Sequence, residues 1–188
     1  MNYTNVFPLQ ILQTPSMSDA YVLVLSAPER GKQIPVIIGE TEAQAIVMAI
    51  ERRQARRPLT HNLLFNIMES FMLTLKKVTI DRFEEGIFYS TLFISDGFTE
   101  KHVDSRTTDA IILALMQGCD VMMDLSVLEE TSMEPGALEA NMPQNKAHLP
   151  NPEEAIEQLE EKLRQCEEAE DYEQAAEIMK RINQLKST

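Results

Sequence analysis

The stretch IGETEAQAIVMAI, residues 38–50, decides the fold, because VDSRTTDAIILAL, residues 103–115, repeats its pattern. The two stretches share Ala-Ile-x-x-Ala when Ala45 is aligned with Ala110. Each reads as the end of a strand, then a polar turn, then a helix with apolar residues at helical spacing. The repeat predicts two related strand-turn-helix units within one domain. The polar turns of both units are therefore candidates for the functional site.

Apolar runs between turn signals predict the rest of the domain. The expected strands cover residues 6–14, 20–27, 34–38, 75–80, 87–94, 99–104 and 119–124. The expected helices run from Glu40 to about Gln54, from a capping Thr60 onward, and through the second repeat to Gly118. One apolar face is expected on the middle helix, formed by Leu63, Leu64, Ile67, Met68 and Phe71. The fold class predicted is α+β, a single mixed-sheet domain with an internal duplication.

The final third of the chain differs in character. Residues 134–151 are rich in proline and lack periodicity, which predicts a flexible linker after a domain at residues 1–133. Residues 152–188 have strong helical propensity and a polar break, which predicts a helical hairpin. Such a small hairpin needs a protein partner for stability, and its predicted contact residues are Tyr172, Ala175, Ala176, Met179 and Ile182.

Composition restricts the classes of function. The chain has 188 residues and a formal net charge of −13, and residues 134–188 hold 13 acidic against 6 basic residues. An acidic surface repels phosphate backbones, so any binding of nucleic acid must be local. Two cysteines, no basic and apolar leader, and no apolar run long enough to span a membrane predict a cytoplasmic protein with reduced thiols.

The ordered set IPVIIGETEAQAI, RRPLTHNLL, DRFEEGIFYSTL and VDSRTTDAIILAL, followed by CDVMMDLSVLEE, resembles the bifunctional nuclease domain family. The resemblance covers residues 3–130. It implies an α+β domain and an activity that cleaves both DNA and RNA. The family often has Asp where this chain has Asn62, and Pro where it has Thr107.

The stretch YEQAAEIMKRINQL, within residues 152–185, resembles a UVR motif. This motif is the helical hairpin through which the helicase and nuclease subunits of nucleotide excision repair interact. The family commonly has Arg-Asp where this chain has Met179 and Lys180. The resemblance implies a protein partner for the C-terminal hairpin.

His61 is the leading candidate for chemistry, because hydrolysis of a phosphodiester needs a group that transfers protons near neutral pH. Arg57 and Arg106 are candidate phosphate contacts, and Asp104 and Asp109 are candidate catalytic carboxylates. The alternative for the two aspartates is an ion pair with Arg106 that fixes the turn without catalysis. Arg57 belongs to a basic cluster that also contains Arg52, Arg53 and Arg56; for Arg52 and Arg53 a solvated helix end is favoured.

Glu40 and Glu42 are candidate metal ligands. If the two repeated units are arranged symmetrically, carboxylates from both can converge on a divalent cation such as magnesium. The alternative is that acidic residues in the first turn of a helix are stabilised by its dipole alone.

Two functions follow from these observations. The first is a nuclease that hydrolyses DNA or RNA, with a C-terminal hairpin for protein interaction. The second is a non-catalytic, oligomeric interaction or adaptor protein linked to DNA repair or stress response. In both cases a homo-oligomer is expected, and no contact with membranes.

Overall fold

A computed structural model describes residues 2–13, 20–53 and 55–137, together with Arg164 and Met179. The chain divides into two units, Met1–Ala147 and His148–Thr188. The predicted linker beyond residue 137 and the predicted hairpin contacts Tyr172, Ala175, Ala176 and Ile182 lie outside the described residues. Met179 is described as a helical residue that is exposed.

The described part is a mixed α+β structure, as predicted. Its strands are β1 (Tyr3–Asn5), β2 (Phe7–Gln13), β3 (Ala20–Ala27), β4 (Lys32–Gly39), β5 (Thr74–Glu84), β6 (Ile87–Ser95), β7 (Glu100–Arg106) and β8 (Asp120–Asp124). Its helices are the short 3-10 helix η1 (Pro28–Arg30) and the α-helices α1 (Glu40–Ile50), α2 (Thr60–Ser70), α3 (Thr107–Gln117) and α4 (Leu125–Thr131). The short β1 and α4 were not predicted as separate elements.

The strands form two sheets, whereas the sequence predicted a single mixed sheet. The larger sheet has the order β1-β8-β5-β6-β7, and only β5 and β8 run parallel within it. The smaller sheet is an antiparallel meander of β2, β3 and β4. Both β4 and β7 lie at sheet edges, and each runs directly into its helix without a loop, β4 into α1 and β7 into α3.

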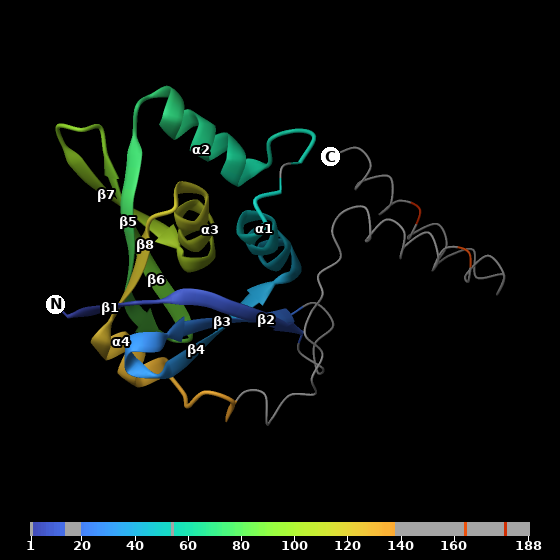
Figure 1. Cartoon of the computed structure of the whole chain (residues 1–188), viewed down its shortest axis with the longest axis vertical. Helices are drawn as coiled ribbons and strands as arrows, with labels where there is room; N and C mark the ends of the chain where they lie inside the picture. Colours follow the sequence, from blue (N-terminus) through green and yellow to red (C-terminus); the bar gives the residue numbers. More distant parts are fainter. Residues whose placement is uncertain (1, 14–19, 54, 138–163, 165–178, 180–188) are drawn as a thin grey trace. The chain divides into compact units, whose positions relative to one another are not determined.

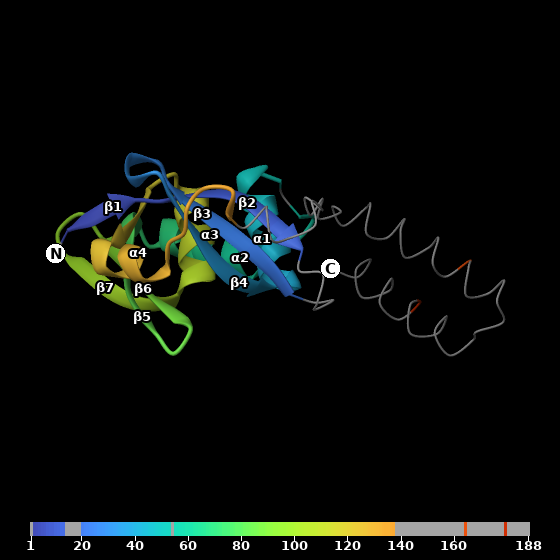
Figure 2. The same cartoon turned by 90° about the horizontal axis from the view of Figure 1, so that it is seen from below.

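Helix α3 is central to the first of the two units. It packs on the larger sheet and also contacts α1 and α2 (Figure 1). Its residues Ala110, Ile111, Ile112, Leu113 and Ala114 are all buried. Helix α1 packs against β3 and β4 of the smaller sheet, which lies in front of it in Figure 2. The other two helices thus meet at α3, and the candidate site lies where the three helices come together.

Helix α1 ends earlier than predicted, at Ile50 rather than near residue 54. The amide of Arg53 donates to the carbonyl of Met48, and the amide of Arg52 donates to that of Ala49. These two bonds form a Schellman motif, in which the turning residue is usually glycine. Here that residue is Arg52, with a φ of 54°. The end of the helix is therefore set by backbone hydrogen bonds well before Pro58.

Helix α2 begins differently from the prediction. Leu59, not Thr60, occupies the capping position, and Thr60 is the first helical residue. The side-chain oxygen of Asn62 accepts a hydrogen bond from the amide of Leu59, at 3.3 Å. This is the reciprocal half of a capping box, with Asn in the place usually held by Glu or Gln.

The predicted apolar face of α2 points mostly outward. Met68 is buried, whereas Leu63, Leu64, Ile67 and Phe71 are all exposed. Periodicity identified the face, but it did not reveal that only one of its residues reaches the core. By contrast, α3 ends at Gly118 in a left-handed conformation, as predicted.

The chain after α4 returns to the smaller sheet. Gln33 of β4 forms an antiparallel bridge with Met133, and Lys32 forms an ion pair with Glu134. Within the described ranges, no helix has the length and apolar character needed to cross a membrane.

Candidate active site

A histidine and an aspartate from different helices form the centre of the site. His61 lies in the first turn of α2 and Asp109 in the first turn of α3. The Nε2 atom of His61 is 2.8 Å from Oδ1 of Asp109. Both side chains are about one-quarter exposed, so the pair is shielded but accessible. The contact between α2 and α3 therefore joins two residues that the sequence proposed separately.

Arg106 holds the other side of Asp109. Its Nε donates to Oδ2 at 2.7 Å and its Nη2 donates to Oδ1 at 3.0 Å, which is a bidentate arrangement. Bidentate pairs of arginine and carboxylate are among the stronger hydrogen bonds and fix orientation as well as distance. The predicted ion pair between Arg106 and Asp109 is present, and the carboxylate also contacts the imidazole.

The first repeated unit contributes through Glu42 of α1. Its Oε1 accepts a hydrogen bond from Nη1 of Arg106 at 3.3 Å. At Gly39, the last residue of β4, an added Cβ would lie 2.7 Å from Oε2 of Glu42. A side chain at residue 39 would therefore make the carboxylate of Glu42 shift from its present position. Carboxylates of both units do converge, but the group between them is a guanidinium.

The charge state of Asp109 follows from these contacts. Burial alone raises the pKa of this carboxyl, but hydrogen bonds from Arg106 and His61 outweigh it, so the pKa lies below its ordinary value of 3.8. The same pairing, with a smaller contribution from Glu42, raises the pKa of Arg106. At neutral pH Asp109 is therefore a carboxylate, which only accepts hydrogen bonds.

This charge state determines the tautomer of His61. Since the carboxylate of Asp109 accepts the bond, Nε2 of the neutral ring carries the hydrogen. The lone pair then lies on Nδ1, which has no hydrogen-bond partner among the described residues. His61 is thus held by one nitrogen and has the other available to accept a proton.

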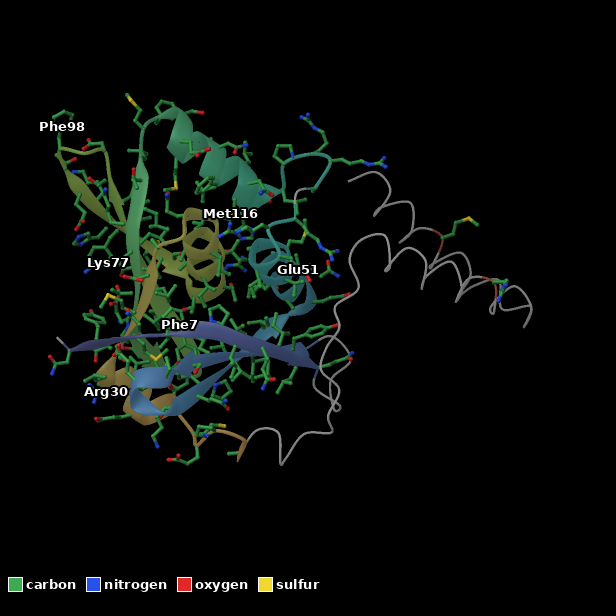
Figure 3. All side chains as sticks on the ribbon, viewed as in Figure 1. Phe7, Arg30, Glu51, Lys77, Phe98 and Met116 are labelled. Carbon is green, nitrogen blue, oxygen red and sulfur yellow. The ribbon has the colours of Figure 1, made fainter. Side chains whose placement is uncertain are left out.

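A cleft of about 510 Å³ opens between α1, α2 and α3, and His61 lines it. Asp109, Arg106 and Glu42 are not among its lining residues, so the imidazole is the part of the cluster that a ligand meets. Met116 of α3, labelled in Figure 3, is one of the residues that line this cleft. The lining is as follows: Ala45, Met48, Ala49, Arg52, Arg53, Leu59, His61, Asn62, Phe65, Asn66, Glu69, Ile112, Leu115, Met116, Gln117 and Gly118.

The cations at the cleft are Arg52 and Arg53, not Arg57. Both follow Glu51, which Figure 3 labels at the end of α1. Nε of Arg53 is 2.7 Å from Oε2 of Glu51, whereas the side chain of Arg52 has no hydrogen bond or ion pair among the described residues. Arg57 is exposed and does not line the cleft. The cleft that His61 lines therefore contains different arginines from the one that the sequence favoured.

The remaining predicted acids lie apart from this centre. Asp104 is exposed on β7, where it pairs in register with Thr91. Glu40 begins α1, and its Oε1 accepts a hydrogen bond from Gln44. No group of three or more Asp, Glu, His and Cys side chains suited to a metal ion occurs within the described ranges. Glu40 and Glu42 as magnesium ligands stay a prediction.

Cys119 directly follows the cleft residue Gly118. Its thiol is free, and burial, together with the nearby charge of Asp120, raises its pKa to about 11. A thiol protonated at neutral pH is a poor nucleophile. Cys119 is therefore not a candidate nucleophile for this site.

The comparisons with known proteins agree with the sequence resemblance. Residues 23–136 match the family described as Bifunctional nuclease domain. Two relatives from Mycobacterium tuberculosis, Uncharacterized protein MT1877 (strain CDC 1551) and Uncharacterized protein Rv1829 (strain H37Rv), are each 30% identical over 112 residues. The alignment covers 60% of this chain and 66% of each relative, just under two thirds of their length. With most of its length matched by the family, the chain belongs to the bifunctional nuclease domain family.

Proposed function

We propose that this protein is a nuclease that hydrolyses phosphodiester bonds of DNA or RNA, with His61 as the general base. One observation carries the proposal: His61, oriented by Asp109 at 2.8 Å, lines the same cleft as Arg52, whose side chain is unpaired among the described residues. A proton acceptor and an available cation facing one cleft are what attack on a phosphate diester requires. Membership of the bifunctional nuclease domain family supports the same reaction.

In the proposed reaction, Nδ1 of His61 takes a proton from water as the water oxygen attacks phosphorus. The bond from phosphorus to the leaving oxygen breaks, and that oxygen gains a proton from His61 or from solvent. Asp109 keeps the ring oriented and stabilises the imidazolium that forms, since a carboxylate beside it favours the charged ring. Arg52 stabilises the additional negative charge on the phosphate oxygens.

Arg106 has a positioning role in this proposal instead of the phosphate contact predicted from the sequence. Its Nε, Nη1 and Nη2 atoms already bind Asp109 and Glu42. The two carboxylates outweigh the single positive charge of the Arg106 guanidinium, so this group would attract a phosphate only weakly. It fixes the carboxylate that fixes the imidazole.

The test is cleavage of end-labelled single-stranded DNA and RNA by the purified full chain, in magnesium and in chelator. We expect product bands that grow with enzyme concentration and time. Comparison of the reactions in magnesium and in chelator shows whether cleavage needs a divalent cation. Binding of such a cation by the carboxylates stays a prediction. Absence of cleavage of either polymer in both conditions would refute the proposed activity.

Arg52→Gly separates function from folding, because it should change them in opposite directions. Arg52 has a left-handed backbone, which costs a non-glycine residue about 1 kcal/mol and costs glycine almost nothing. We expect the melting temperature to stay equal or rise while the cleavage rate falls about 10- to 100-fold, from loss of one charged contact. Thermal unfolding and initial rates measure the two effects.

Arg57→Gly is the matched control for this variant, because Arg57 belongs to the same basic cluster but lies outside the cleft. It should keep the cleavage rate of the wild type. Equal rate losses in the two variants would show that the cluster acts through its general charge, and would remove Arg52 from the site.

The adaptor function predicted from the sequence also has an observation in its favour, namely the outward apolar face of α2. Binding a protein through this face is compatible with catalysis in the cleft, since the two surfaces use different residues of α2. The predicted C-terminal hairpin belongs to this proposal as a second contact for a protein partner.

A further inference from the structure

We infer that the cleft binds a single unpaired nucleotide base, so that the substrate of this site is single-stranded nucleic acid. This inference rests on the proposed nuclease function and adds the form of its substrate. The volume of the cleft, about 510 Å³, lies within the range of about 300–1,000 Å³ that is typical of small-ligand sites. One nucleotide fits such a space, whereas a duplex does not.

The lining of the cleft suits a base better than a phosphate. Apolar side chains come from all three helices, with Met48 from α1, Phe65 from α2 and Leu115 from α3 among them. These groups would not compensate a phosphate for its lost hydration. They do suit the flat apolar faces of a base, and Phe65 is an aromatic ring on which a base can stack.

Amide side chains in the same cleft suit the edges of a base. The side-chain oxygen of Asn62 is used by the amide of Leu59, so its NH2 group stays available as a donor. Asn66 and Gln117 also line the cleft and offer both donors and acceptors. Together with Arg52 for the adjoining phosphate, the cleft contains partners for each part of a nucleotide.

A base can reach this cleft only when it is not paired inside a helix. Bases of a duplex must be flipped out before they enter a protein pocket, and unpairing costs free energy. The charge of the chain does not offset that cost, since a net charge of −13 repels the dense phosphates of a duplex. The local arginines at the end of α1 suffice for one or two phosphates of a single strand.

The test measures binding separately from cleavage. Full-length His61→Ala protein is titrated with a fluorescent single-stranded oligonucleotide, the same strand with abasic sites, and the corresponding duplex. We expect the normal single strand to bind more tightly than the other two. Phe65→Ala, added to this protein, should weaken binding of the normal strand about 5- to 100-fold, as loss of base stacking does. It should change binding of the abasic strand little.

Phe98→Ala is the matched control. Phe98 is almost fully exposed and is labelled in Figure 3 at the turn between β6 and β7, outside the cleft. It should leave all three affinities unchanged. Equal binding of single strand and duplex, or equal effects of the two phenylalanine variants, would overturn the inference even if the protein is a nuclease. Preferential binding through Phe65 without cleavage by the wild type would instead refute the proposed activity alone.

A second observation independently supports a contact between two copies of the chain. We propose that the outward face of α2 forms a symmetric dimer. Leu63, Leu64, Ile67, Phe71 and Met72 are 55%, 42%, 44%, 70% and 82% exposed. At about 200 Å² for a fully exposed large side chain, this is on the order of 600 Å² per copy. Two copies would bury about 1,200 Å², the lower end of the range for stable interfaces.

The absence of charge on this face makes it suitable for contact with a second copy. Between Leu63 and Met72 the only charged residue is Glu69, and Glu69 lines the cleft instead. Two chains of net charge −13 repel each other, so they can associate only through a surface without like charges. A two-fold axis near Ile67 would bring Leu63 of one α2 beside Phe71 of the other.

The outward face of α2 ends at a residue with a left-handed backbone. Met72 has a φ of 56°, a left-handed conformation that a non-glycine residue adopts at a cost. Leu73 donates to the carbonyl of Met68, which closes the same type of helix end as at Arg52. Met72 is therefore the residue at which the chain turns out of α2, and its side chain is 82% exposed beside Phe71 in the sequence.

The test is the mass of the full chain in solution by light scattering across a range of concentrations. We expect a dimer that dissociates at least 10-fold more readily in Ile67→Glu and in Met72→Gly, and the glycine variant should fold at least as stably as the wild type. Ile37→Glu is the matched control, because Ile37 is 77% exposed on β4, away from α2. A monomeric wild type, or equal dissociation of the Ile67 and Ile37 variants, would overturn the proposal.

Discussion

Replacing His61 with alanine is expected to lower the rate of phosphodiester cleavage about 10²- to 10⁴-fold, the usual contribution of a general base. The loss should appear in kcat, with a smaller change in KM, because the other cleft residues still bind substrate. The fold should be retained, since His61 is a partly exposed residue in the first turn of α2. Single-turnover cleavage of labelled RNA and DNA measures the effect.

His102→Ala is the matched control. His102 lies on β7, its Nε2 is 3.1 Å from a carboxylate oxygen of Glu100, and it does not line the cleft. Each histidine therefore has its own acidic neighbour, but His61 lines the cleft and His102 does not. If both variants cleave like the wild type, the base is another group, and the assignment of His61 is wrong.

Asp109→Asn should have an effect of similar size for a different reason. The amide NH2 of asparagine can donate to Nε2 of His61, and this favours the ring form with its hydrogen on Nδ1. The nitrogen that faces away from residue 109 then has no lone pair for a proton. We expect a loss of about 10²- to 10⁴-fold in kcat at neutral pH. The substitution also removes the bidentate partner of Arg106, so the free energy of unfolding should fall.

The dependence of that stability loss on pH tests the role of the charge. Because the pKa of Asp109 is lower in the folded protein than its ordinary value of 3.8, its carboxylate stabilises the fold fully above that value. The contribution disappears as the pH falls through the lowered pKa. The difference in unfolding free energy between wild type and Asp109→Asn should therefore be constant at neutral pH and shrink below about pH 4. Denaturant unfolding at several pH values measures it.

Asp104→Asn is the control for both effects. It makes the same substitution on β7, at an exposed carboxylate that has no side-chain hydrogen bond among the described residues. Activity and stability should both stay near those of the wild type. Comparable losses in the two variants would mean that the overall charge of this region, and not the contact with His61, is what matters.

The elements of the fold were predictable because each is encoded locally. Alternation in residues 87–94 and the repeated strand-turn-helix pattern marked strands and helices that the structure contains, and Gly118 marked the end of α3. The early end of α1 was not predictable in this way. It depends on Arg52 in a conformation that sequence patterns assign to glycine. That the β strands divide into two sheets depends on long-range pairing, which local patterns do not contain.

The site was predictable in its residue types but not in its partners. His61, Arg106 and Asp109 were chosen for their chemistry, and the structure brings all three together. The acid that contacts the imidazole is Asp109, which lies 48 positions after His61 in the sequence. That contact exists only because α2 packs on α3. From the sequence, the side chain of Arg52 was expected in solvent at a helix end. Its place at the cleft depends on a left-handed backbone conformation that the sequence does not show.

The edge strand β7 has a consequence for how the protein behaves when concentrated. Its outer residues Glu100, Lys101, His102, Val103 and Asp104 are all exposed, and most carry or can acquire charge. Open sheet edges invite strands of other molecules to add and begin fibrils, and charged side chains discourage this. Apolar replacements along β7 should therefore promote amyloid-like assembly. The strand that positions Arg106 beside Asp109 therefore also protects the edge of the larger sheet from fibril formation.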